Sequence, residues 1–112
     1  MERTPDGHFV VEGRRWRAED PGLPPEVAAG LRRELMAARR AVGAALRAAD
    51  PVAERAARDR VRRAKVGLGE RREPWWEQSA SARRMRWQTA VAEIDALDGG
   101  GSAWRVRAGS RR

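Results

Sequence analysis

The chain has 112 residues and a formal net charge of +8, from 24 Lys and Arg against 16 Asp and Glu. It has no cysteine and one histidine, which excludes disulfides, zinc–thiolate sites and thiol nucleophiles and leaves little general acid–base chemistry. No stretch approaches about eighteen apolar residues and no apolar run follows the charged N-terminus, so we expect neither a membrane span nor a secretory signal.

The composition predicts a thin core. Val, Leu, Ile and Phe total only 17 residues, whereas there are 21 alanines and five tryptophans. Alanine favours helices and lets them approach closely, and each tryptophan brings a large area that can be buried. We therefore expect alanine-padded helices.

The first predicted element is a β-hairpin over residues 8–18. Two alternating segments flank Glu12-Gly13, and a two-residue loop with Gly second suits a tight turn. In that register Phe9 faces Trp16, and both lie on one face. An isolated hairpin is marginal in water, so we expect this face to pack on the helices that follow.

A long antiparallel αα-hairpin is predicted next, with helices over 25–48 and 51–67. Proline suits the first turn of each helix, and Asp50 can cap the second. Apolar residues recur at helical spacing along both segments, which predicts one buried seam on each. The seam residues are Ala28, Leu31, Leu35, Ala38, Val42, Ala45 and Ala49 on the first helix, and Val52, Ala53, Ala57, Val61, Ala64 and Leu68 on the second. Gly67 and Gly69 are expected to end the second helix.

A third helix is predicted over 79–97, capped by Ser79 or Ser81. Its apolar positions are Trp87, Ala90, Val91, Ile94 and Leu97. A glycine run then predicts a flexible basic tail over 99–112, although Trp104 and Val106 alternate as in a strand and could instead join the hairpin. The predicted fold class is therefore mainly α (α+β): a β-hairpin packed on an αα-hairpin, plus a third helix, in one small domain over 1–98.

Positive charge concentrates on the helical hairpin and the tail. The net charge is +4 over residues 27–48, +5 over 51–72 and +4 over 99–112. Off the seam of the first helix, arginines extend over about 21 Å, a length that could follow a nucleic-acid backbone. The predicted nucleic-acid-binding residues are Arg32, Arg33, Arg39, Arg40, Arg47, Arg105, Arg107, Arg111 and Arg112. The alternative is a solvated helix face in an arginine-rich protein.

Two adjacent tryptophans, Trp75 and Trp76, suggest a protein-interaction site. Neighbouring residues on one element cannot both face the same core, so one ring is expected to be exposed beside the arginine-rich surface. This favours an adaptor for an acidic protein partner, or a homodimer, as the alternative function. The two rings could instead both wrap a helix end.

Nothing in the sequence indicates catalysis. His8 is expected on the surface of a strand, and Gly67-Leu68-Gly69 is too short for a phosphate loop. We therefore predict a non-enzymatic binding module, without cofactor or metal and without membrane association, whose main function is sequence-independent binding of nucleic-acid backbone.

Three runs carry a resemblance to a family of small, arginine-rich actinobacterial proteins. They are Gly13-Arg14-Arg15-Trp16-Arg17, Ala64-Lys65-Val66-Gly67-Leu68-Gly69-Glu70-Arg71 and Pro74-Trp75-Trp76-Glu77, within a similarity that covers about residues 5–77. Members are often named Tol-type biopolymer transporters, but no membrane segment, signal or propeller repeat supports that name here. The resemblance implies a cytoplasmic bacterial protein and one structural unit of hairpin and helices, and it implies no activity.

Overall fold

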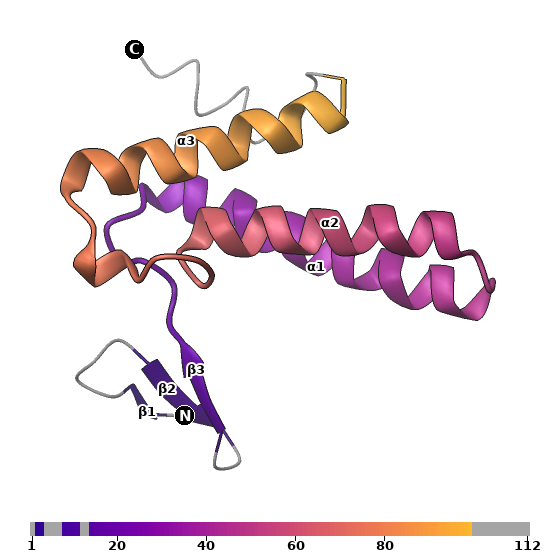
Figure 1. The fold of residues 1–112 in the computed structure, drawn as a ribbon, viewed down its shortest axis with the longest axis horizontal. Helices are drawn as coiled ribbons and strands as arrows, with labels where there is room; N and C mark the ends of the chain where they lie inside the picture. The colour runs from indigo at the N-terminus through magenta and orange to yellow at the C-terminus, as the bar shows by residue number, and fades with distance from the viewer. Residues whose placement is uncertain (1, 4–7, 12–13, 100–112) are drawn as a thin grey trace.

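The computed structural model is mainly helical, as predicted, and describes residues 2–3, 8–11 and 14–99, with side chains described from residue 17 onward (Figure 1). Its three long helices are α1 (Pro25–Arg47), α2 (Pro51–Leu68) and α3 (Ala80–Leu97). A short 3-10 helix, η1 (Trp75–Glu77), lies between α2 and α3. Each long helix begins and ends within one residue of the range expected from the sequence.

In the described part of the N-terminal region, three short strands precede the helices. They are β1 (Glu2–Arg3), β2 (His8–Val11) and β3 (Arg14–Arg17), and they pair antiparallel in the order β1-β2-β3. Phe9 lies opposite Trp16 in the β2–β3 register. The packing of this face on the helices stays a prediction, because these two side chains are outside the described part.

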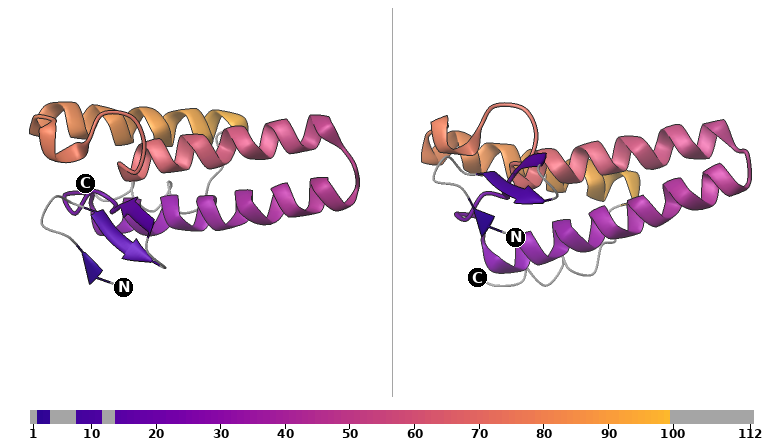
Figure 2. Two further views of the ribbon diagram at one scale, coloured as in Figure 1. Left: turned by 60° about the horizontal axis from the view of Figure 1, so that its bottom comes forward. Right: turned by 90° about the horizontal axis from the view of Figure 1, so that it is seen from below.

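Local signals fix the helical hairpin that α1 and α2 form side by side (Figures 1 and 2). The Asp50 carboxylate accepts a hydrogen bond of 3.0 Å from the backbone N–H of Ala53 and caps α2, while Pro51 takes its first position. Gly69, with a φ of 86°, ends α2 in the left-handed conformation that glycine adopts most easily. The expectation that Gly67 helps to end α2 is wrong, since Gly67 is a buried residue of the helix.

The third helix completes the core at one end of the hairpin. Ser79 rather than Ser81 caps α3, because the Ser79 Oγ accepts from the backbone N–H of Ala82 at 3.1 Å. Buried residues from all three helices and from the loop before α1 form one apolar cluster: Leu23, Val27, Ala28, Leu31, Leu35, Ala64, Leu68, Val91 and Ile94. Figure 2 shows that the far end of α1 and α2, where the two helices join, extends beyond α3.

That extension explains where the predicted seams are wrong. Val52 is 66% exposed, and Ala49 and Ala53 are exposed as well, because no third element among the described residues covers the tip of the hairpin. Ala49 lies in the turn with a φ of 53°. Leu97, expected to be buried, is 46% exposed at the last turn of α3.

Candidate functional site

Three arginines on α1 form a row that faces away from the core. Arg33, Arg40 and Arg47 are seven residues apart and lie about 160 to 200° around the helix from Leu31, which is fully buried. All three are exposed, and none forms an ion pair with a described residue. We call these three residues the arginine row; at 1.5 Å per residue it is about 21 Å long.

The other two predicted arginines of α1 lie on the flank of the helix and differ from each other. Arg32 donates from Nε to the Glu19 carboxylate at 3.1 Å, so part of its charge is compensated. Arg39 is exposed and acts electrostatically on Lys65 and Glu70 of α2 and the following loop. Burial lowers the pKa of Lys65 and raises the pKa of Glu70, which places these two groups in a partly dehydrated site beside Arg39.

The expectation that both helices offer free positive charge needs correction for α2. Four of its five arginines bind the chain's own carboxylates: Arg58 with Glu54 at 2.8 Å, Arg60 with Asp98 at 2.8 Å, and both Arg62 and Arg63 with Asp59 at 2.6 Å. Arg55 is exposed and forms no ion pair with a described residue. Arg63 also lies 3.0 Å from Glu93 of α3. Most arginines of α2 are therefore paired, and the arginine row of α1 is the longest run of exposed, unpaired arginines in the described part of the hairpin.

The two tryptophans of η1 have different environments. Trp75 is half-buried, donates from Nε1 to the Ala18 carbonyl at 2.9 Å and lies 5.3 Å from the Arg83 guanidinium. Trp76 is 37% exposed, and its ring meets that of Trp75 edge-on at 5.1 Å. The Arg17 guanidinium lies 5.7 Å from the Trp76 ring. Trp75 therefore holds the loop before α1 in place, and Trp76 presents the more accessible face.

A buried cluster of opposite charges joins the loop before α1 to α3, and the sequence did not predict it. Asp20, which is 3% exposed, accepts hydrogen bonds from both Arg83 and Arg86 of α3. Burial alone would raise the pKa of Asp20, but the bonds from the two arginines and from the Gly22 N–H outweigh it and lower the pKa to about 2. The one available signal was the spacing of Arg83 and Arg86, three apart on one face of α3.

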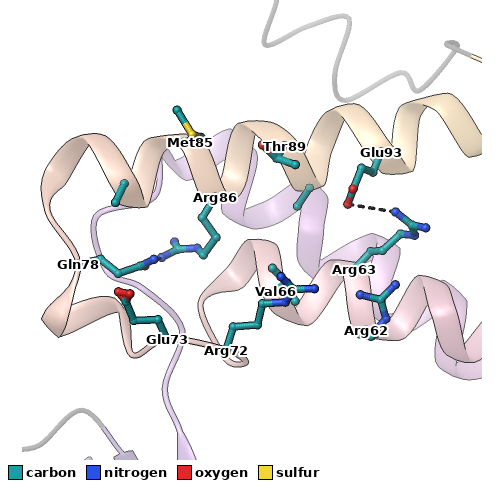
Figure 3. Close-up of a pocket in the computed structure, with 12 residues that line it drawn as sticks. Arg62, Arg63, Val66, Arg72, Glu73, Gln78, Met85, Arg86, Thr89 and Glu93 are labelled. Carbon is teal, nitrogen blue, oxygen red and sulfur yellow. Dashed lines mark hydrogen bonds and ion pairs between the residues drawn. The ribbon is translucent and has the colours of Figure 1, made fainter.

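The structure also contains a cleft between α2 and α3, which no motif indicated (Figure 3). Its volume is about 510 Å³, and its polar lining consists of Arg62, Arg63, Arg72, Arg86, Glu73, Glu93, Gln78 and Thr89. These residues come from α2, the following loop and α3, and the cleft shares no residue with the arginine row. It is therefore a separate candidate site.

The predicted tail residues Arg105, Arg107, Arg111 and Arg112 lie outside the described residues. In the part that the structure describes, no helix is both long enough and apolar enough to cross a bilayer. Comparison with protein-family models, curated proteins and solved structures gave no match for this chain. The resemblance to the actinobacterial family stays a prediction.

Proposed function

We propose that the chain binds the sugar–phosphate backbone of nucleic acid, without sequence preference, through the arginine row of α1. The observation that carries the proposal is the arrangement of Arg33, Arg40 and Arg47, exposed and without a described ion-pair partner, on the side of α1 opposite the core. A guanidinium fork matches phosphate geometry and stays charged at all physiological pH values.

The dimensions of the row suit a polyanion. A duplex segment as long as the row, about 21 Å, carries about 12 phosphates. Ala37, Gly43 and Ala44 lie between the arginines and add little bulk, whereas Met36, which is 44% exposed, places an apolar side chain beside the row. Arg39 beside the row, and the predicted tail arginines, would add further contacts of the same kind.

Salt dependence of binding tests the proposal. Fluorescence anisotropy with a labelled duplex of about 24 base pairs, from about 50 to 200 mM salt, should give a log–log slope of about −3 or steeper, since each neutralised phosphate contributes about −0.9. The triple variant Arg33→Gln, Arg40→Gln, Arg47→Gln should flatten that slope by about 3 and weaken binding at low salt.

A charge-matched variant separates the row from net charge alone. Arg55→Gln, Arg58→Gln, Arg84→Gln removes the same charge from exposed positions on α2 and α3. It should keep most of the slope and the affinity of the unmodified chain. Equal loss in both triple variants, or no binding of the unmodified chain at about 50 mM salt, would refute the proposal.

A protein–protein adaptor, or a homodimerising scaffold, is the second candidate function. The observation that favours it is the tip of the helical hairpin, which no other described element covers and where Leu46 is 54% and Val52 66% exposed. A second copy packed on this tip would bury both side chains. Sedimentation of the pure protein should then show a dimer that persists at high salt and is lost in the variant Leu46→Gln, Val52→Gln.

A further inference from the structure

The cleft between α2 and α3 has the size of a small-ligand site. Its volume of about 510 Å³ falls within the roughly 300 to 1,000 Å³ typical of such pockets. Apolar side chains of Val66, Ala82 and Ala90 form part of its wall, and charged groups surround them. Figure 3 shows α3 on one side and α2 with the following loop on the other.

Guanidinium groups outnumber carboxylates in the lining by four to two. At one end, Arg62 and Arg63 are held by Asp59, and Arg63 also binds Glu93 at 3.0 Å. Their charges are compensated within the protein. The other end holds Arg72 and Arg86, and there the compensation is incomplete.

Arg86 is buried, with 6% of its side chain exposed, and it keeps an unused donor. Its Nη2 donates to Asp20 at 2.8 Å and its Nη1 to Gln78 at 2.7 Å, while Nε has no hydrogen-bond partner among the described residues. Asp20 is shared with Arg83, so the three groups together carry one excess positive charge. Figure 3 shows Arg86 reaching from α3 towards Gln78 at this end of the cleft.

Arg72 is held at the opposite wall by a strained backbone. Its φ is 67°, a left-handed conformation that is unfavourable for a residue with a side chain, and its carbonyl accepts a 2.7 Å hydrogen bond from Arg17 Nη1. The side chain is exposed and forms no ion pair with a described residue. In Figure 3 it lies along the α2 wall beside Val66. Backbone strain of this kind clusters at active sites and ligand-binding loops.

We propose that this cleft binds a compact organic anion, with its carboxylate or phosphate between Arg72 and Arg86 and a small apolar body against Val66, Ala82 and Ala90. The guanidinium of Arg72 supplies a fork for the anionic oxygens. Arg86 faces it from the α3 wall, as part of the cluster with Asp20 and Arg83 that carries one excess positive charge. The Glu73 carboxylate lines the same end and opposes the ligand, so it limits the affinity.

Calorimetric titration of the full chain tests the site with phenyl phosphate, benzoate, inorganic phosphate and phenol. Phenyl phosphate or benzoate should bind about tenfold more tightly than either inorganic phosphate or phenol, because only the first two carry both halves of the proposed ligand. Whichever of phenyl phosphate and benzoate binds more tightly shows whether the cleft prefers a phosphate or a carboxylate. No saturable binding, or equal binding of phenyl phosphate and inorganic phosphate, would overturn the proposal.

Two variants at the cleft should act in opposite directions. Arg72→Gln should weaken binding about tenfold, and Glu73→Gln should strengthen it about threefold. The neighbouring variants Arg71→Gln and Glu77→Gln make the same charge changes at exposed positions outside the lining and should leave affinity within about twofold. Equal effects at the cleft and control positions would show nonspecific charge attraction and contradict the site. Duplex binding by the arginine row is measured separately, so either proposal can fail alone.

Discussion

Asp20 and Arg86, 66 residues apart in the sequence, form an ion pair in which both side chains are almost wholly buried. The Arg86 Nη2 lies 2.8 Å from the Asp20 Oδ2. The backbone N–H of Asp20 also donates to the Leu68 carbonyl at the end of α2, at 2.7 Å. Asp20 therefore ties the loop before α1 to both α2 and α3, in a protein whose core has few large apolar residues.

Removing the Asp20 charge should destabilise the fold strongly. In Asp20→Asn, Arg86 stays buried and Arg83 half-buried without a counter-charge, and breaking a buried pair from one side typically costs about 3 to 5 kcal/mol. We expect the free energy of unfolding, measured by urea denaturation followed by tryptophan fluorescence, to fall by about 3 kcal/mol.

Glu19→Gln is the matched control for that loss. It removes one charge from the preceding residue, whose partner Arg32 is 54% exposed, and surface pairs are worth about 0 to 1 kcal/mol. The change should therefore cost less than about 1 kcal/mol. If the two variants lost similar stability, the buried cluster would not be the main tie between the loop and α3.

The low pKa of Asp20 predicts how stability depends on pH. Because the pKa is lowered from 3.8 to about 2 in the folded state, the stabilisation is complete above about pH 5 and is lost as the pH falls through about 4 towards 2. The loss should be about 2 kcal/mol. Asp59, whose pKa is also lowered, and Glu70, whose pKa is raised, titrate in both proteins, so the difference between the unmodified chain and Asp20→Asn isolates Asp20. Urea midpoints that changed in parallel from about pH 6 to 2.5 would contradict this.

The helix boundaries could be predicted from the sequence because the residues that determine them act locally. Asp50 caps its own helix three residues later, Ser79 does the same, and Gly69 ends α2 through its own backbone angle. The apolar period then fixed which side of α1 is buried. The prediction of burial is wrong at Val52 and Leu97. Apolar periodicity shows which face of a helix could be buried, but it does not show whether another element packs against that face.

The sites were less accessible to the same reasoning because they depend on pairing across long stretches of chain. The tie of Asp20 to Arg83 and Arg86 spans more than 60 residues, and nothing near Asp20 indicates it. Segment charge overstated α2 for a related reason: Arg60 is compensated by Asp98, which lies beyond the next helix. The exposed row on α1 could be found because all three arginines lie on one helix at heptad spacing.

Replacing either of two helical glycines, Gly67 and Gly43, by alanine should change the free energy of unfolding in opposite directions. A Cβ on Gly67 would lie 2.9 Å from the Ala90 Cβ and 3.0 Å from the Leu31 Cδ1, inside the core. Gly67→Ala should therefore lower the free energy of unfolding by about 1 to 3 kcal/mol, despite the better helix propensity of alanine. A Cβ on Gly43 would lie 3.3 Å from Nη1 at the end of the flexible Arg47 side chain. Gly43→Ala should therefore raise the free energy of unfolding by about 0.5 to 1 kcal/mol. Thermal denaturation of the two variants, which should shift in opposite directions, tests the close approach of α2 to its neighbours.

The two residues with side chains in left-handed backbone, Ala49 and Arg72, should both tolerate glycine, but with different functional outcomes. Glycine adopts a positive φ without the steric penalty of about 1 to 2 kcal/mol, partly offset by its greater freedom in the unfolded chain. Ala49→Gly and Arg72→Gly should therefore each raise the free energy of unfolding by about 0.5 kcal/mol. Only Arg72→Gly should also weaken the binding of phenyl phosphate or benzoate, measured by calorimetry. A loss of stability in Arg72→Gly would mean that its side chain stabilises the fold, and the strain at this position would no longer argue for a ligand.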